Sequence, residues 1–393
     1  MSSLVPEGWT KERLGDHVKL ESGNAFQSLE FSDKGTPIVR ISNIRNDKID
    51  LLNAVYYEGN NHLEKFLIAD GDILLAMSGA TTGKIGKYTY SFKSYLNQRV
   101  GRFKIIDETK SENEYIYQLV RSREFAENTL IDAIGGAQPN ISSSQVENVV
   151  YKFPPLPEQK KIASILTSVD EVIENTQKQI DKLQDLKKAT MNELLTKGIG
   201  HTEFKDSELG RIPKSWEVSL IGEVCEVGTG KKDTQNKMKY GKYPFFVRSQ
   251  TIERIDSYSF DGEAILTAGD GVGTGKVFHY VNGRFDFHQR VYKLSHFRGG
   301  ALGKFLYYCF SSRFLKQVQQ FSARGSVESV RMEMITGMAI PLPSLQEQSK
   351  IVDCISAIET NISIGKQKLS QTQSLKKSLM QDLLTGKVRV RVN

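Results

Sequence analysis

The chain has 393 residues, of which 39% are hydrophobic and 25% charged, which is typical of a folded protein with two or three domains. No apolar run approaches the roughly eighteen residues that span a membrane, and the N-terminus lacks the pattern of a signal peptide. Three widely spaced cysteines argue against a disulfide framework and fit a reducing cytoplasm. No histidine or cysteine spacing matches a metal site, so none is expected.

The net charge of +7 is compatible with binding to nucleic acid, but it is unevenly distributed. Residues 1–150 contain 17 basic and 20 acidic residues, a net charge of −3. Residues 200–339 contain 20 basic and 15 acidic residues, a net charge of +5. Contacts with DNA phosphates are therefore expected to contribute more in the second half of the chain.

From its first residues onward the chain contains an internal repeat with a spacing near 190 residues. Motifs recur in the same order, from a Pro-x-x-Trp turn at each start to a Leu-Leu-Thr sequence at each end. The matched pairs are Pro6–Trp9 with Pro213–Trp216, Pro37–Ser42 with Pro244–Ser249, Asp70–Leu75 with Asp261–Leu266, Gly83–Lys84 with Gly275–Lys276, Gln98–Val100 with Gln289–Val291, Gly136 and Ile141 with Gly325 and Val330, Glu158–Gln159 with Glu347–Gln348, and Leu194–Thr196 with Leu383–Thr385. So many matches in one order indicate a duplicated module.

Each copy begins with a β-rich part of about 140–155 residues. Short runs of Val, Ile, Phe and Tyr are broken there by Gly, Asn and Asp, which predicts a mixed α+β domain. Helical patches are predicted near residues 114–125 and 302–321. Each β-rich part ends at a proline-rich stop, Pro154–Pro157 or Pro341–Pro343, which favours the start of a helix.

A long helix is predicted after each stop, because residues 158–195 and 347–384 contain no proline over 38 residues. Apolar residues recur every three or four positions, with interruptions of the stripe at Thr176 and Gly365. These residues are Ile162, Leu166, Val169, Ile173, Ile180, Leu183 and Leu194 in the first copy, and Ile351, Ile355, Ile358, Ile362, Leu369 and Leu383 in the second. Each helix would be about 57 Å long.

A lone helix with one apolar stripe is unstable in water, so each helix needs a partner. Each either packs on its own globular domain or pairs with the other copy's helix, and the matched length and stripe favour the pair. The predicted fold is α+β, with two β-rich domains separated by a pair of long helices in an internal repeat. The expected domains are residues 1–153 and 199–340, the helices residues 154–198 and 341–386, and residues 387–393 a basic tail.

In combination these motifs resemble the specificity subunits of type I restriction-modification systems over essentially the whole chain. The resemblance lies in the sequence from Pro154 to Ala163, in Gln138–Ser142 just upstream, and in the helix ends Leu194–Thr196 and Leu383–Lys387. It implies two β-rich target-recognition domains separated by two long antiparallel helices in a pseudo-twofold repeat. Each domain then reads one half of a bipartite double-stranded DNA site. The helices then act as a spacer and dock two adenine-methyltransferase subunits.

The resemblance also implies an ATP-dependent translocase and nuclease subunit as a further partner. S-adenosylmethionine, ATP and magnesium are then expected on partner subunits only, with no cofactor on this chain. The sequence itself shows no catalytic motif: the only Pro-Pro, at Pro154–Pro155, lacks the neighbours of an amino-methyltransferase motif. The alternative function is an autonomous DNA-binding regulator with two reading domains.

Candidate DNA contacts divide by whether both copies carry them. Residues that are the same in both domains cannot distinguish two different half-sites, so they are expected to grip the DNA backbone or hold the fold. This shared set is Arg40, Lys84, Gln98, Arg99, Arg248, Lys276, Gln289 and Arg290. For the two lysines, which follow glycine-rich loops without the spacing of a nucleotide-binding loop, a phosphate contact and a solvated position remain equal alternatives.

Base reading is instead expected from loop residues that the copies do not share. These are Asn43, Arg45, Asn97, Gln250, Arg254 and His288. The alternative for each is a solvated or locally hydrogen-bonded loop residue. The basic tail, residues 387–391, either contacts DNA or a partner subunit or is a frayed end.

Overall fold

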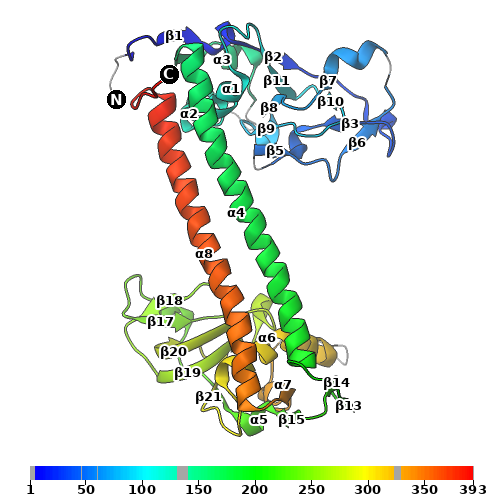
Figure 1. The fold of residues 1–393 in the computed structure, drawn as a ribbon, viewed down its shortest axis with the longest axis vertical. Helices are drawn as coiled ribbons and strands as arrows, with labels where there is room; N and C mark the ends of the chain where they lie inside the picture. The colour runs from blue at the N-terminus through cyan, green and yellow to red at the C-terminus, as the bar shows by residue number, and fades with distance from the viewer. Residues whose placement is uncertain (1–4, 46, 60, 131–139, 323–328, 393) are drawn as a thin grey trace. The chain divides into compact units, whose positions relative to one another are not determined.

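The computed structural model describes residues 5–45, 47–59, 61–130, 140–322 and 329–392 (Figure 1). The chain divides into two compact units, each with its own core. Unit 1 contains Met1–Gln177 and Gln367–Asn393, and unit 2 contains Lys178–Lys366. The motif residues Gly136, Gln138, Pro139 and Gly325 lie outside the described residues.

Unit 1 contains two larger sheets and a short strand pair. The order of one sheet is β2 (Val18–Ser22), β11 (Val100–Ile105), β8 (Ile73–Ala76), β9 (Ile85–Lys87), β5 (Asp47–Ile49) and β4 (Ile44–Arg45). The order of the other is β6 (Val55–Tyr57), β3 (Thr36–Val39), β10 (Ser94–Leu96) and β7 (Leu67–Ile68). Strands β1 (Thr10–Arg13) and β12 (Val150–Phe153) pair separately and tie the start of the unit to the residues just before its long helix.

The central strand β8 is apolar at every position because its sheet is covered on both faces. Ile73 and Leu75 belong to the core that also contains helices α1 (Asn113–Val120) and α2 (Arg123–Leu130). Leu74 and Ala76 point to the opposite face and belong to a second core. A single helical patch was predicted near residues 114–125. The structure breaks it, because the Ser122 hydroxyl accepts a hydrogen bond from the Phe125 amide and starts a new helix.

Unit 2 repeats this layout around a sheet that follows the order β16 (Glu226–Thr229), β21 (Val291–Ser295), β19 (Phe260–Ala268), β20 (Phe278–Phe287), β17 (Tyr243–Phe246) and β18 (Glu253–Ile255). Strand β19 again divides its side chains, with Ile265 in one core and Ala264 and Leu266 in another. The remaining elements are β13 (Phe204–Ser207), β14 (Gly210–Pro213), β15 (Glu217–Leu220), α5 (Ile221–Val224), α6 (Gly303–Ser322), α7 (Met332–Thr336) and β22 (Ala339–Leu342).

The two long helices are α4 (Leu156–Lys197) and α8 (Leu345–Leu384). They extend slightly beyond the proline-free stretches 158–195 and 347–384 and lie within the expected segments 154–198 and 341–386. In unit 1, Ile162 and Leu166 near the start of α4 share a core with Leu383 and Leu384 at the end of α8. In unit 2, Leu195 near the end of α4 shares a core with Ile351 and Ile355 near the start of α8. The helices therefore run antiparallel within each unit (Figure 1).

Both alternatives considered for the apolar stripe turn out to contribute. In unit 2 the helices meet each other closely, since a side chain added at Gly365 would lie 3.0 Å from Ile180 Cγ1. The same helices also complete the cores of the β-rich parts, as the shared clusters show. None of the helices in the described ranges is long and apolar enough to cross a membrane.

Candidate nucleic-acid interface

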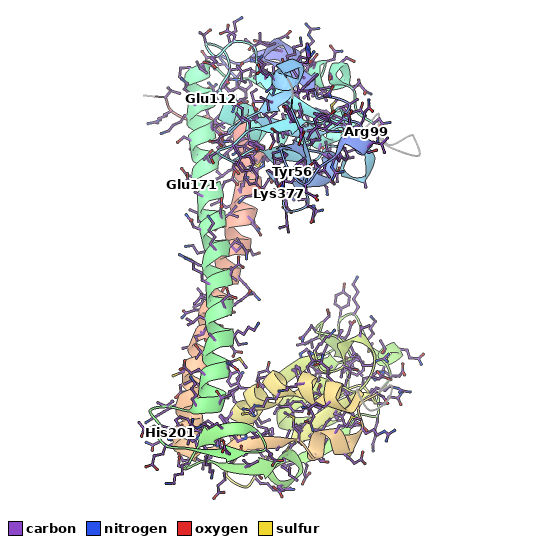
Figure 2. The ribbon with its side chains drawn as sticks, turned by 90° about the vertical axis from the view of Figure 1, so that its right-hand side faces the viewer. Tyr56, Arg99, Glu112, Glu171, His201 and Lys377 are labelled. Carbon is purple, nitrogen blue, oxygen red and sulfur yellow. The ribbon has the colours of Figure 1, made fainter. Side chains whose placement is uncertain are left out.

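In unit 1 most of the shared candidate residues come together at one edge of the β-rich part. Backbone hydrogen bonds connect three loops there: Gln98 N donates to Asn24 O at 2.8 Å, and Asn97 N donates to Val39 O at 3.1 Å. The Thr81 hydroxyl donates to Ile41 O at 3.2 Å. We call residues 40–43, 78–84 and 97–99 the first loop cluster. Figure 2 shows Arg99 on the side of unit 1 away from α4.

Unit 2 forms a corresponding edge with the same kind of connections. Gln289 N donates to Lys232 O at 2.8 Å, and His288 N donates to Phe246 O at 2.9 Å. The side-chain amide nitrogen of Gln250, Nε2, donates to Lys276 O at 3.3 Å. We call residues 248–250, 270–276 and 288–290 the second loop cluster. Segments that are distant in sequence thus meet in the same arrangement in both units.

Six of the shared residues present exposed side chains on these clusters. They are Lys84, Gln98, Arg99, Lys276, Gln289 and Arg290. Among the described residues no acidic group pairs with Lys84, Arg99 or Lys276. Such side chains are available to a phosphate or a base edge as they stand.

Arg40 and Arg248, the other shared pair, do not occupy corresponding positions. Val39 and Phe246 are the residues that accept the matching backbone hydrogen bonds, so Arg40 corresponds to Val247, and Arg248 to Ile41. Arg40 lies over the Phe31 ring, 5.9 Å from its centroid, whereas Arg248 donates to Asp270 at 2.8 Å. The two arginines are therefore not a matched pair, because Pro37–Ser42 and Pro244–Ser249 align from proline to serine and place Arg40 opposite Val247, in agreement with the backbone hydrogen bonds.

Two of the unshared candidates are buried. Asn43 is 4% exposed; its amide oxygen accepts from Arg40 N at 2.9 Å and its amide nitrogen donates to Asp50 O at 2.8 Å. His288 is 3% exposed, and its Nδ1 accepts from Arg290 N at 2.9 Å. Burial lowers the pKa of His288. These contacts favour the local, structural alternative for both residues.

The other unshared candidates remain at the surface with modest local contacts. Arg45 donates to Ser42 O at 3.0 Å, and Arg254, on β18 outside the second loop cluster, donates to the carbonyls of Gly241 and Lys242 at 2.9 Å. Asn97 is half-buried and accepts from Arg99 N at 3.3 Å, while Gln250 is exposed. Of these four, Asn97 and Gln250 lie directly in the loop clusters.

The largest chemical difference between the clusters is at one position that the sequence reasoning did not single out. Ser78 and Asp270 each precede the glycine of a short 3-10 turn. Each forms a β-bridge to a residue near the end of its β-rich part, Asn140 and Ser329 respectively. The Asp270 carboxylate lies between Arg248, at 2.8 Å, and Arg290, at 3.0 Å. Asp270 thus neutralises part of the second cluster, and Ser78 leaves Arg99 without an acid.

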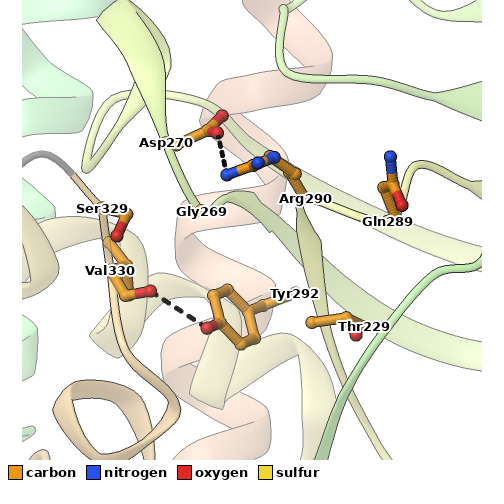
Figure 3. A pocket seen from close by; sticks show the side chains of 8 residues that line it. All are labelled: Thr229, Gly269, Asp270, Gln289, Arg290, Tyr292, Ser329 and Val330. Carbon is orange, nitrogen blue, oxygen red and sulfur yellow. Dashed lines mark hydrogen bonds and ion pairs between the residues drawn. The ribbon is translucent and has the colours of Figure 1, made fainter. Parts of the chain in front are cut away.

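A pocket of about 350 Å³ opens beside this ion pair in unit 2 (Figure 3). Asp270, Gln289 and Arg290 line it together with Thr229, Gly269, Tyr292, Ser329 and Val330. The Tyr292 hydroxyl donates to Val330 O at 3.0 Å and closes its floor. The pocket therefore presents donors and an acceptor on a rigid sheet edge, which suits hydrogen bonding to polar groups of a nucleic acid.

The Glu-Gln motif at the start of each long helix holds the fold rather than a ligand. Glu158 accepts from Trp9 Nε1 at 3.0 Å and from two nitrogens of Arg389 at 2.8 Å. Burial acts to raise the pKa of Glu158, but the hydrogen bonds from Arg389 and Trp9 outweigh it and the pKa lies below its usual value. The basic tail is therefore anchored on unit 1 through Arg389 instead of being frayed.

Glu347 repeats this arrangement in unit 2, where it accepts from Trp216 Nε1 at 3.0 Å and contacts His201 Nε2 at 2.8 Å. The adjacent glutamines act alike: Gln159 contacts the backbone of Lys110, Glu112 and Pro154, and Gln348 the backbone of Gly300, Leu302 and Pro343. In the sequence, both copies carry a Pro-x-x-Trp motif together with a Glu-Gln motif. This joint recurrence was the signal from which the contacts could have been predicted.

Each unit also has one ion pair between α4 and α8 that reaches the β-rich part. In unit 1, Asp170 pairs with Lys376 and accepts from Gln118 and Arg121 of the α1 region at 3.0 Å. In unit 2, Glu359 pairs with Lys187 at 2.8 Å and accepts from the Tyr308 hydroxyl of α6 at 2.6 Å. Asp170 and Glu359 occupy equivalent positions of the repeat. Each connects α4 to α8 and also connects the helix pair to the β-rich part of its unit.

The arrangement was compared with known proteins. The family model described as type I restriction modification DNA specificity domain matches residues 6–185 and again residues 213–373. The chain belongs to this family. The two matches cover both copies of the repeat, and this confirms the α+β fold with two β-rich units and long helices.

Two similar relatives come from Methanocaldococcus jannaschii, the putative type I restriction enzyme MjaX specificity subunit and the MjaVIII specificity subunit. Each is 28% identical and covers 98% of this chain, with 95% and 94% of the relative's own length. The family and these relatives confirm the expectation of a non-catalytic DNA-specificity subunit rather than an enzyme.

Two solved structures share the fold. The type I restriction-modification S subunit from M. genitalium has a TM-score of 0.67 at 15% identity and covers 98% of both chains. A chain from a structure on complex assembly and conformational transition of the type I R-M system has a TM-score of 0.56 at 17% identity and covers 98% of this chain and 100% of that one.

As a specificity subunit, the chain presents its polar side chains for binding. In the ranges that the structure describes, no group of three or more His, Cys, Asp or Glu residues is arranged to hold a metal ion. Burial raises the pKa of the Cys225 and Cys309 thiols to about 12, so neither is a reactive thiolate at neutral pH. The loop clusters present exposed basic and amide side chains whose chemistry suits DNA.

Proposed function

We propose that this specificity subunit selects a bipartite double-stranded DNA site, with one half-site read at each loop cluster. The reading domains are residues 1–153 and 199–340, and the spacer helices are residues 154–198 and 341–386. The observation that carries the proposal is the presence of two clusters built by the same backbone connections, with different side chains around them. The same backbone arrangement with different loop side chains in each unit is suited to binding two different half-sites.

Within each cluster the shared and unshared residues take different roles. Lys84, Arg99, Lys276 and Arg290 grip phosphates, with Gln98 and Gln289 beside them and Arg40 and Arg248 supporting the loops. Base reading falls to Asn97 and Gln250, and to Arg45 and Arg254 where the DNA reaches them. Asn43 and His288 position neighbouring loop residues, as their buried hydrogen bonds support.

The helix pair sets the gap between the half-sites and docks two adenine-methyltransferase subunits. An ATP-dependent translocase and nuclease subunit joins them for restriction, and S-adenosylmethionine, ATP and magnesium bind to those partners. This role takes place on DNA in the cytoplasm. Support comes from the family and from the absence of a catalytic motif in the sequence, which leaves the chemistry to partner subunits.

A domain exchange tests the two-reader proposal. Residues 1–153 are replaced by the equivalent domain of another specificity subunit, with a tryptophan kept at the position of Trp9 because it hydrogen-bonds Glu158. The complex with methyltransferase is expected to methylate DNA at a site in which only one half has changed. The matched exchange of residues 199–340 should change only the other half, and a change in both halves would refute separate readers.

A helix insertion tests the spacer. One helical turn, about 5.4 Å, inserted into both α4 and α8 after Gln177 and before Gln367 should lengthen the tolerated gap by one or two base pairs. An unchanged gap would rule out the proposal that the helices set the spacing between the half-sites. Tight, specific DNA binding by the purified chain without methyltransferase would instead support an autonomous regulator.

A further inference from the structure

The loop between β16 and β17 in unit 2 carries an unusual density of positive charge. Residues 231–242, which we call the lysine loop, contain five lysines and a single acid, Asp233. The corresponding loop of unit 1, residues 24–35, contains one lysine and two acids. Among the segments beside the clusters, this loop accounts for much of the charge difference between the two halves of the chain.

The lysine loop is attached directly to the second loop cluster. Gln289 N donates to Lys232 O at 2.8 Å, and the Gln289 amide donates to Asp233 at 3.1 Å. Further along, Met238 N donates to Arg254 O at 2.8 Å, and Lys237 pairs with Glu253 at 3.2 Å. The loop is therefore held against the second loop cluster at its start and against β18 further along.

Lys231, Lys239, Tyr240 and Lys242 of the loop have exposed side chains. Tyr240 is 86% exposed, with Lys239 5.3 Å from the centre of its ring. Among the described residues no carboxylate pairs with Lys231, Lys239 or Lys242. Several unpaired ammonium groups on one short loop repel one another in the free protein, and an anionic backbone relieves that repulsion.

The equivalent loop of unit 1 has the opposite character. Phe26 and Phe31 pack toward the core that contains Ile38 and Tyr95, and Glu30 accepts a hydrogen bond from Tyr57. Its aromatic side chains are thus used within the unit and its acids disfavour a phosphate. A loop that serves packing in one unit is left exposed and basic in the other.

We infer that the lysine loop is a DNA-backbone contact specific to unit 2, and that it supplies a large part of the salt-dependent affinity of the complex for any DNA sequence. The inference rests on the proposed function and assigns sequence-independent binding and sequence choice to different loops. Phosphate contacts from a basic loop strengthen binding without regard to sequence, so the sequence choice remains with the loop clusters.

The test is the triple substitution Lys231→Gln, Lys239→Gln and Lys242→Gln in the full chain assembled with its methyltransferase subunits. Binding of a duplex without the recognition site is measured against salt concentration. Each lost phosphate contact reduces the slope of log affinity against log salt by about 0.9, so the slope is expected to fall by about 2 to 3. The methylated sequence should not change.

The matched control removes three exposed lysines of unit 2 that lie outside the loop, Lys205, Lys316 and Lys350, also to glutamine. It has the same net charge and is expected to lower the slope by less than one. Equal slopes for both triple variants, or a changed methylated sequence, would overturn the inference. If the wild-type complex methylates no specific sequence, the proposed function itself fails, whatever the lysines do.

Discussion

The loops at Gln98–Arg99 in unit 1 and Gln289–Arg290 in unit 2 are held by the same backbone hydrogen bonds but have different charges around them. In unit 1, no acid of the described residues pairs with Arg99, and the adjoining loop of residues 24–35 is slightly acidic and partly packed. In unit 2, Arg290 is paired with Asp270, and the adjoining lysine loop is basic and exposed. The two copies therefore share the backbone arrangement of their loop clusters, while the charged side chains around the clusters differ.

The units also differ in how far they bury the ion pair that connects their helices. Lys376 and Arg121 beside Asp170 are 10% and 11% exposed, whereas Lys187 and Lys304 beside Glu359 are 30% and 27% exposed. Charges that are removed from water depend more strongly on their partner. The same position in the repeat therefore contributes differently to the stability of each unit.

The largest expected effect comes from removing these acids. Asp170→Ala leaves the buried Lys376 without its counter-charge, while Arg121 keeps its ion pair with Asp47, and is expected to lower the free energy of unfolding by about 3 kcal/mol. Glu359→Ala is expected to cost about 1 to 2 kcal/mol, because water screens its lysines. Denaturant unfolding of the full chain measures both, with the exposed Asp185→Ala as control. Equal losses would contradict the difference in burial.

The same acids predict sensitivity to low pH. Burial acts to raise the pKa of Asp170, but Arg121 and Lys376 outweigh it, and the pKa lies below its usual value. A depressed pKa stabilises the fold above about pH 4, the unfolded value, and that contribution disappears as the pH falls through the folded pKa. Unfolding measured from pH 7 to pH 3 should show this loss, and Asp170→Asn should flatten it. An unchanged profile in the variant would argue against the pair.

A reciprocal exchange between the clusters has a smaller expected effect. Asp270→Ser frees Arg248 and Arg290 and should tighten binding to non-cognate duplex severalfold, with a salt slope steeper by about one. Ser78→Asp places an acid beside Arg99 and should have the opposite effect in unit 1. Thermal unfolding checks that both variants fold. Shifts in the same direction would show that Asp270 does not restrain the charge of its cluster.

The smallest expected effect is at the helix contact of unit 2. Gly365→Ala gains about 1 kcal/mol of helix propensity but brings a methyl group to 3.0 Å from Ile180 Cγ1. The two effects oppose each other, so the free energy of unfolding should change by less than about 1 kcal/mol. Gly365→Thr, which copies the buried Thr176 of the first repeat, should cost about 1 to 3 kcal/mol by overpacking. A large loss with alanine would mean that this contact cannot relax.

The sequence by itself determined the repeat, the two long helices and the mixed character of the β-rich parts. These features follow from local periodicity: a stripe at every third or fourth residue and a proline stop at Pro154–Pro157 need no knowledge of distant contacts. The same comparison of copies identified Lys84, Arg99, Lys276 and Arg290 as surface candidates. Their roles in DNA binding stay predictions.

Only the tertiary structure decided how the side chains are used. The burial of Asn43 and His288 depends on the neighbouring loops that their side chains and backbones contact. Glu158 meets Trp9 and Arg389 across 149 and 231 residues, and Asp270 meets its arginines across a sheet edge. Spacing along a chain cannot reveal such partners, because they are set by which distant segments the fold brings within hydrogen-bonding distance.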